Sequence, residues 1–251
     1  MTKDRIINIC LTVALIISLG WSARNYLKYN VIMSYKVPTE SMSPTINPGD
    51  HIIVNRLAYG ARLFNSPYDS VKCGTIVRKK GYSEPKRGDI MVFNQTCFLG
   101  WDTIAFDIMK YFVKRCVALP GDTFEIKNAH YFVRGISDTL GFKTAQDLAV
   151  YSDYCMKNFG PLYLPKKGDT LKITSENISL YRKIFEWEKG GKIIQKDDGN
   201  FYLDGDSLIT FHVMRDSYYF MAGDNVLNSL DSRFWGLVPE EFIVGRVDLI
   251  Y

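Results

Sequence analysis

Residues Tyr111–Asp122, YFVKRCVALPGD, combine an extended segment with the turn that ends it. Aromatic and β-branched side chains favour a strand, and Pro-Gly-Asp at its end is typical of a turn. Lys114 lies inside this apolar strand. A lysine in a strand usually points to solvent, but Phe112, Val113 and Val117 make partial burial plausible here. Burial would lower the pKa of Lys114, because the charged form loses its hydration.

Segments of similar character lie on both sides, separated by turns rich in glycine, proline and aspartate. The predicted strands are 51–54, 90–93, 111–118, 123–126, 131–133, 170–174, 218–222 and 242–247. This pattern predicts a mainly β protein. One helix is predicted at 176–186, where apolar side chains at 178, 181 and 185 recur at intervals of three and four.

The N-terminal part of the chain has a different character. Residues 6–23 contain no charged side chain, and eighteen such residues are near the lower limit for a helix that spans a bilayer. A cleavable signal peptide is the alternative, but Trp21 is too bulky for the position two before Ala23 in a cleavage site. We therefore expect an uncleaved anchor. Positive charges on both sides of the run leave its orientation open.

Composition excludes several classes of protein. The 251 residues include 31 Lys and Arg against 27 Asp and Glu, a net charge of +4 that does not indicate a nucleic-acid-binding protein. Apolar residues at 47% exclude an extended disordered chain. The five cysteines form no C-x-x-C pair and have no nearby histidine, so no metal site is expected. An odd number cannot all pair within one chain, although a single disulfide remains open.

Two further segments carry candidate chemistry. VPTESMSPT at 37–45 is a hydroxyl-rich turn between prolines, and many such turns have no function. The three histidines lie in or beside predicted strands, so a serine–histidine site is hard to assemble. Serine with a neutral lysine as general base is an established alternative, and Lys114 could supply that base. The other segment is GDNVLNSLDSRFWGLVP at 223–239.

Together these segments closely resemble bacterial type I signal peptidases, a family of membrane-anchored Ser-Lys endopeptidases that remove signal peptides from exported proteins. The resemblance covers about a quarter of the chain, in the order of the family. Its four blocks are PTESMSPTINPGDHIIVNRLAYG, PKRGDIMVF, YFVKRCVALPGD and GDNVLNSLDSRFWGLVPEEFIVGRV.

The resemblance implies specific roles at the catalytic positions. Ser41 would be the nucleophile and Lys114 the general base. The Thr39 hydroxyl and the Ser41 backbone N–H would form the oxyanion hole, where negative charge develops on the intermediate. The Ser229 hydroxyl would hydrogen-bond the lysine amine and orient it.

Supporting and substrate-binding residues follow from the same resemblance. Asp231 and Arg233 would form an ion pair that supports the site. A shallow apolar substrate pocket would accept small side chains, in an Ala-x-Ala pattern, from an extended substrate that pairs with strand edges near 34–40 and 111–114. Its expected lining residues are Val37, Pro38, Met42, Ile46, Phe112 and Val113.

The family fold implies two antiparallel β-sheet regions on an N-terminal transmembrane helix. Residues 31–122 and 217–251 would form the catalytic core, 123–216 an inserted cap, and 6–23 the anchor. The chain would be a single-pass protein of the cytoplasmic membrane, with its catalytic domain on the outer face. We expect a monomer that acts on secretory preproteins, contacts membrane lipid, and uses no nucleic acid, metal or cofactor.

Two departures from the family pattern affect these expectations. Val226-Leu227 replaces a frequent Arg-Asp, which puts local charge pairing in doubt. The apolar stretch that includes Phe98, Trp101 and Phe106 is unusually long. It predicts either a hairpin packed on the core or a segment that dips into the bilayer surface.

Two alternative functions remain open. A self-cleaving Ser-Lys regulator shares the chemistry, but it usually carries a DNA-binding segment, and the membrane-like N-terminus disfavours it. A catalytically inactive, membrane-tethered β-module that binds exported chains is disfavoured by the intact Ser41, Lys114 and Ser229.

Overall fold

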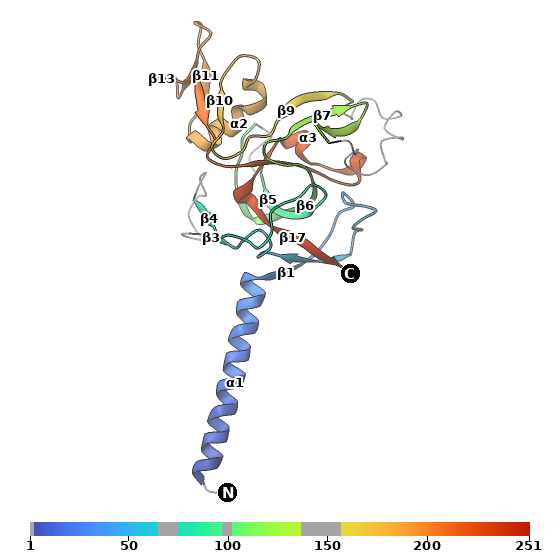
Figure 1. Cartoon of the computed structure of the whole chain (residues 1–251), viewed down its shortest axis with the longest axis vertical. Helices are drawn as coiled ribbons and strands as arrows, with labels where there is room; N and C mark the ends of the chain where they lie inside the picture. Colours follow the sequence, from blue (N-terminus) through green and yellow to red (C-terminus); the bar gives the residue numbers. More distant parts are fainter. Residues whose placement is uncertain (1–2, 65–74, 97–101, 137–156) are drawn as a thin grey trace.

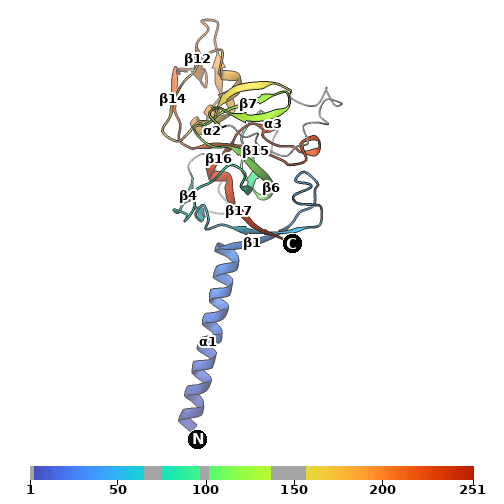
Figure 2. The ribbon, with the colours of Figure 1, turned by 45° about the vertical axis from the view of Figure 1, so that its right-hand side comes forward.

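A long N-terminal helix precedes a β-rich body in the computed structural model, which describes residues 3–64, 75–96, 102–136 and 157–251. Helix α1, Lys3–Asn30, extends away from the body (Figures 1 and 2). Its apolar side chains are solvent-exposed from Ile9 to Trp21. Among the described residues, no helix meets both the length and the hydropathy required to cross a membrane.

Seven strands from both ends of the chain form the main sheet, in the order β1-β2-β17-β5-β6-β15-β16. All its neighbouring strands pair antiparallel. The strands are β1 Ile32–Lys36, β2 His51–Asn55, β5 Ile90–Gln95, β6 Asp107–Ala118, β15 Tyr218–Ala222, β16 Val238–Pro239 and β17 Ile243–Ile250. The sheet therefore brings residues 32–118 together with residues 218–250.

The remaining described strands form four small antiparallel sheets. β3 (Arg62–Phe64) pairs with β4 (Ile76–Arg78). The other three sheets are β8-β7-β9, β10-β14 and β11-β12-β13. Their strands are β7 Thr123–Lys127, β8 His130–Val133, β9 Phe159–Tyr163, β10 Thr170–Lys172, β11 Ile193–Gln195, β12 Phe201–Leu203, β13 Ser207–Leu208 and β14 Phe211–Val213. Between β10 and β11 lies helix α2, Ile178–Lys189.

The mainly β prediction is confirmed, and each predicted strand is present within a few residues. The expected second sheet region is divided into three small sheets, because its strands are short and turns interrupt them. Helix α2 begins two residues later than predicted and ends three later. It ends where Gly190 adopts the left-handed conformation (φ 74°) that glycine allows without strain. The short helices η2 (Val226–Asn228), α3 (Ser232–Trp235) and η3 (Glu240–Phe242) were not predicted.

One hydrophobic cluster joins the main sheet to the strands that follow it. Phe220 on β15 stacks on Phe124 of β7, with ring centroids 4.1 Å apart, and α2 adds Phe185 to the same cluster. A second cluster lies beneath the segment after β1 and includes Met42, Ile46 and Val92. This second cluster supports the turn that carries Ser41.

Candidate active site

The turn after β1 presents Ser41 at the surface of the second cluster. Met42 and Ile46 are fully buried in the cluster beneath the turn, and Ser41 itself is only 7% exposed. Within the turn, the Ser43 N–H donates to the Glu40 carbonyl at 2.9 Å, and the Ile46 N–H donates to the Met42 carbonyl at 3.0 Å. The buried methionine and these main-chain bonds fix the direction of the neighbouring serine.

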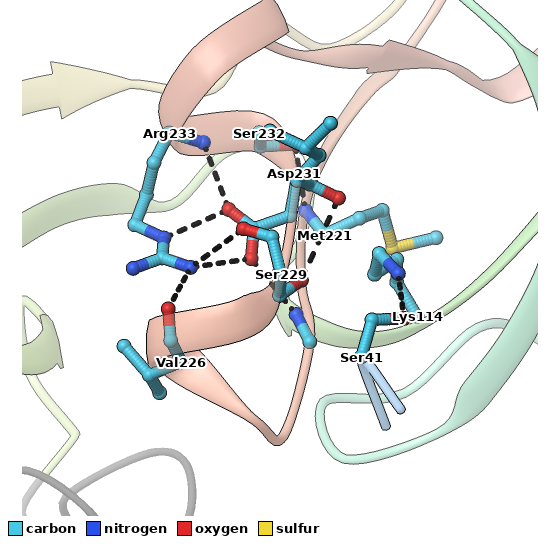
Figure 3. Close-up of polar contacts among 10 residues, drawn as sticks. Ser41, Lys114, Met221, Val226, Ser229, Asp231, Ser232 and Arg233 are labelled. Atoms are coloured by element: carbon cyan, nitrogen blue, oxygen red, sulfur yellow. Dashed lines mark hydrogen bonds and ion pairs between the residues drawn. The ribbon is translucent and has the colours of Figure 1, made fainter. Parts of the chain in front are cut away.

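Lys114 reaches this turn from the middle of the main sheet. Strand β6 pairs there with β5 on one side, placing Lys114 opposite Met91. The lysine side chain is buried, and its Nζ donates to Ser41 Oγ at 2.6 Å (Figure 3). Desolvation by burial lowers the pKa of Lys114 to about 8, although Asp231 and Asp224 act to raise it. The lysine therefore loses its proton more readily than an exposed one.

A third segment, from β15 to α3, packs against the Ser41 turn. Gly223 has no room for a side chain, because an added Cβ would lie 2.4 Å from the Ser41 carbonyl oxygen and 2.1 Å from Ser229 Oγ. Ser229 is buried, and its hydroxyl donates to the Leu230 carbonyl at 3.5 Å. Within the described residues it makes no hydrogen bond to Lys114, so the predicted contact with the amine is not formed here.

Asp231 and Arg233 form a buried ion pair behind this segment (Figure 3). Arg233 Nε lies 2.8 Å from Asp231 Oδ1, and its second contact, from Nη2 to Oδ2, is also 2.8 Å. The guanidinium also donates to the carbonyls of Val226 and Ser229, and the Gly223 N–H donates to Asp231 Oδ2. The Asp231–Arg233 pair therefore links the main chain around Ser229 to Gly223, the residue that follows β15, through hydrogen bonds.

Sequence reasoning missed two contacts of this segment. Arg115 forms a second ion pair with buried Asp224, with Nη2 and Oδ2 2.6 Å apart. Asn225 contacts the main chain of the Ser41 turn. The signal for Arg115 was its position next to Lys114, since alternate residues of a strand face opposite sides and a charge there requires its own partner. With Arg115 paired to Asp224, local charge pairing does not depend on the positions occupied by Val226 and Leu227.

A cavity of about 420 Å³ lies beside the Ser41–Lys114 contact, between β1 and β6. Thr39 also faces it, with its hydroxyl oxygen 3.5 Å from Ser41 Oγ. The rings of Tyr35 and Tyr111 lie with centroids 5.1 Å apart within the lining. The lining residues are Tyr35, Lys36, Val37, Pro38, Thr39, Ser41, Ile52, Val92, Gln95, Lys110, Tyr111, Phe112, Val113 and Lys114.

The structure brings four of the six expected substrate-binding residues to this cavity. Val37, Pro38, Phe112 and Val113 line it. Met42 and Ile46 do not, because their side chains are fully buried in the cluster beneath the Ser41 turn.

The apolar stretch before β6 is described only in part. Phe98 and Trp101 lie outside the described residues. Phe106 packs inward, with its ring centroid 5.0 Å from that of Phe242, which agrees with the packed alternative at this position. Cys116 is a buried free thiol, whereas Cys97 lies outside the described residues.

Candidate metal ligands are not clustered in the part of the chain that the structure describes. His212 is instead buried and contacts Glu188, with Nε2 and Oε2 2.6 Å apart. This histidine therefore has a carboxylate partner inside the fold, remote in sequence from the Ser41 turn.

Several known proteins resemble this chain in sequence. The chain is 28% identical over 229 residues to signal peptidase I of Buchnera aphidicola from Acyrthosiphon pisum, covering 86% of this chain and 67% of that one. It is 28% identical over 235 residues to signal peptidase I of Aquifex aeolicus, covering 90% and 78%. A crystal structure of a signal peptidase I from Enterococcus faecalis aligns with 66% of this chain and 97% of that one, at 20% identity and a TM-score of 0.31.

The sequence profile of the family described as signal peptidase, peptidase S26 matches residues 6–251. The match covers nearly the whole chain, including the Ser41 turn, β6 and the segment from β15 to α3. The chain therefore belongs to the S26 family of signal peptidases.

Proposed function

We propose that this chain is a membrane-anchored serine endopeptidase that removes signal peptides from exported preproteins, with Ser41 as nucleophile and Lys114 as general base. The observation that carries the assignment of roles is the 2.6 Å contact between Lys114 Nζ and Ser41 Oγ. A buried lysine with its pKa near 8 provides a neutral amine at mildly alkaline pH. A neutral amine at hydrogen-bond distance is what a serine hydroxyl requires in order to lose its proton.

The reaction runs in two stages. Neutral Lys114 takes the proton of the Ser41 hydroxyl as Oγ bonds to the carbonyl carbon of the scissile peptide. The resulting ammonium gives this proton to the leaving amine as the C–N bond breaks, which leaves an ester on Ser41. Lys114 then takes a proton from water, whose oxygen attacks the ester, and the Ser41 hydroxyl is restored.

The oxyanion hole would be formed by the Ser41 N–H with the Thr39 hydroxyl. The Ser41 N–H donates no hydrogen bond to any described residue, so it is available to the developing negative charge. The distance of 3.5 Å between the Thr39 and Ser41 hydroxyl oxygens keeps the second donor near the reacting centre. Removing one such donor typically lowers kcat by about 100- to 1,000-fold.

The substrate would lie extended in the cavity between β1 and β6. Val37, Phe112 and Val113 provide apolar walls, and the Tyr35–Tyr111 ring pair reduces the space beyond them. Walls of this kind favour small side chains near the cut, since a larger side chain would have to displace an aromatic ring. The main chain of the substrate would pair with exposed edges near 34–40 and 111–114.

Helix α1 would serve as the membrane anchor. Its uncharged run at 6–23 and its exposed apolar side chains, such as Leu15, Ile16 and Ile17, support this role. Signal peptides emerge on the outer face of the cytoplasmic membrane, so the catalytic body would lie there as a monomer beside lipid. Residues 31–122 and 217–251 would form the catalytic unit, since every strand of the main sheet comes from them, with 123–216 as an inserted cap.

The test is cleavage of a preprotein with an Ala-x-Ala site by the detergent-solubilised chain. We expect one cut after the second alanine, lost in both Ser41→Ala and Lys114→Met. Ser43→Ala and Lys127→Met are matched controls, because the Ser43 hydroxyl contacts Asn47 and Lys127 is exposed on β7. Binding without cleavage by the wild type would favour the inactive β-module instead. Cleavage that survives Lys114→Met would show that another group is the base.

A further inference from the structure

Asn225 makes two contacts with the turn that carries Ser41. Its side-chain Nδ2 donates to the Glu40 carbonyl at 3.1 Å. Its backbone N–H donates to the Ser41 carbonyl, also at 3.1 Å. One residue of the segment after β15 therefore holds both peptide groups that flank Ser41.

The contact with Glu40 determines where the Ser41 N–H points. The Glu40 carbonyl and the Ser41 N–H belong to one peptide group, and in a trans peptide the two point in opposite directions. The carbonyl accepts two hydrogen bonds, from the Ser43 N–H at 2.9 Å and from Asn225 Nδ2. With the carbonyl held on one side, the N–H is directed to the other, where it contacts no described acceptor.

The same contact strengthens the N–H as a donor. A hydrogen bond accepted by a peptide carbonyl polarises the whole peptide group, and such chains of hydrogen bonds reinforce one another. The Ser43 bond belongs to the turn itself, whereas the Asn225 bond comes from a distant segment. Without Asn225, the Glu40 carbonyl would accept only the hydrogen bond from the Ser43 N–H. The Asn225 side chain therefore both orients the Glu40–Ser41 peptide and makes the Ser41 N–H a stronger donor.

We propose that Asn225 is a positioning residue for the oxyanion hole, acting through the Glu40–Ser41 peptide. This inference rests on the proposed function. When Ser41 Oγ bonds to the substrate carbonyl carbon, the π electrons of that carbonyl move to its oxygen and the hydroxyl proton moves to Lys114. The Ser41 N–H then donates to the new oxyanion, and Asn225 keeps that N–H directed at it.

Two substitutions at Asn225 distinguish the effect of its side-chain hydrogen bond from that of its backbone hydrogen bond. Asn225→Ala removes the donor to Glu40 and keeps the backbone bond to Ser41. Asn225→Asp keeps the shape of the side chain but places a carboxylate against the Glu40 carbonyl. Asn228→Ala is the matched control, since Asn228 lies in the same short helix η2, is exposed, and has no side-chain hydrogen bond among the described residues.

The expected result is a loss in kcat without a change in KM. Removal of one hydrogen bond that acts in the transition state predicts about a tenfold lower kcat for Asn225→Ala, and a larger loss for the aspartate variant. The pH at half-maximal kcat stays at the wild-type value in the alanine variant, because Lys114 is untouched. A peptide aldehyde, which forms a tetrahedral adduct with a serine hydroxyl, loses affinity by the same factor as kcat. The affinity of the corresponding peptide amide stays constant, and the Asn228 variant matches the wild type throughout.

Three outcomes would overturn the inference while leaving the proposed function intact. These are wild-type kcat in both Asn225 variants, a change confined to KM, and a loss that high pH fully restores. If the wild type cuts nothing, the proposed function itself fails. Thermal unfolding of each variant verifies the fold, and if the alanine variant is unfolded, the isosteric aspartate variant carries the same comparison.

Discussion

Lys114 Nζ lies 2.6 Å from Ser41 Oγ, and the two residues are separated by 73 positions in the sequence. The main sheet creates this contact by placing β6 beside the turn that follows β1. Burial of the lysine is a consequence of the same arrangement, because apolar strands flank β6 on both sides. Proximity and the lowered pKa therefore have one structural origin.

The rate of cleavage should rise with pH through the pKa of Lys114. In the proposed mechanism the neutral amine is the active form, so with a pKa of about 8 we expect activity to be low at pH 6, half-maximal near pH 8 and level above pH 9. The measurement is kcat/KM for a preprotein across this range, because kcat/KM reports the pKa of the free enzyme, with chemistry shown to be rate-limiting. A rate that is flat from pH 6 to 9 would exclude Lys114 as the base.

Lys114→Met should abolish cleavage and also stabilise the fold at neutral pH. Burial lowers the pKa of the lysine from 10.5 to about 8, so below pH 8 the folded state holds a charge that burial disfavours. Removing this charge should raise the free energy of unfolding by on the order of 1–3 kcal/mol at pH 7.

The gain in stability expected for Lys114→Met depends on pH. Between pH 8 and 10.5 the unfolded wild type binds more protons than the folded one, so wild-type stability rises with pH and the advantage of the variant shrinks. Urea unfolding of the detergent-solubilised chain at pH 7 and pH 10.5 measures both values. Lys172→Met, at an exposed position on β10, is the control. A variant less stable than the wild type at pH 7 would contradict the expectation.

Asp231 and Arg233 should shift the pH profile in opposite directions. The carboxylate of Asp231 raises the pKa of Lys114 and the guanidinium of Arg233 lowers it. Asp231→Asn should therefore move the midpoint of the pH profile of kcat/KM below 8, and Arg233→Gln should move it above 8. Each leaves a buried charge without its partner and should destabilise the fold by about 3–5 kcal/mol.

The profile is measured on variants verified as folded at the assay temperature. Arg233→Lys keeps the charge and should keep the midpoint near the wild-type value. Shifts in the same direction for Asp231→Asn and Arg233→Gln would show that the ion pair acts on Lys114 through structure rather than charge.

The sequence predicted those parts of the site that depend on short segments. The strand that contains Lys114 and the turn that contains Ser41 each have a local pattern, and the burial of Lys114 followed from its apolar neighbours. Met42 and Ile46 are predicted to line the substrate pocket, whereas the structure buries both beneath the Ser41 turn and neither lines the cavity between β1 and β6. Periodicity cannot show which side of an irregular turn faces the core, because a turn has no repeating geometry.

Contacts between distant segments could not be predicted from local pattern. The bond from Asn225 to Glu40 joins positions 185 residues apart, and neither residue type signals such a partner. For Ser229 the position could be predicted, but the hydrogen-bond partner could not. Its position follows from the family motif, yet whether its hydroxyl contacts Lys114 or Leu230 depends on small rotations that the sequence does not encode.

Gly223→Ala should reduce cleavage strongly by displacing the Ser41 turn. An added Cβ would lie 2.1 Å from Ser229 Oγ and 2.4 Å from the Ser41 carbonyl oxygen. The Ser229 hydroxyl can rotate away, but the Ser41 carbonyl is main chain, so the Ser41 turn or the Gly223 main chain must also move. A displacement of about 1 Å at a reacting group can lower the rate by about 100-fold. Gly121→Ala is the control for this substitution, because no atom lies within 4 Å of a Cβ added at Gly121.

The positive φ of Gly121, 91°, predicts that this control loses about 1 kcal/mol in stability but nothing in kcat. The two variants are compared by kcat and by thermal unfolding, and wild-type activity in Gly223→Ala would show that the turn tolerates displacement.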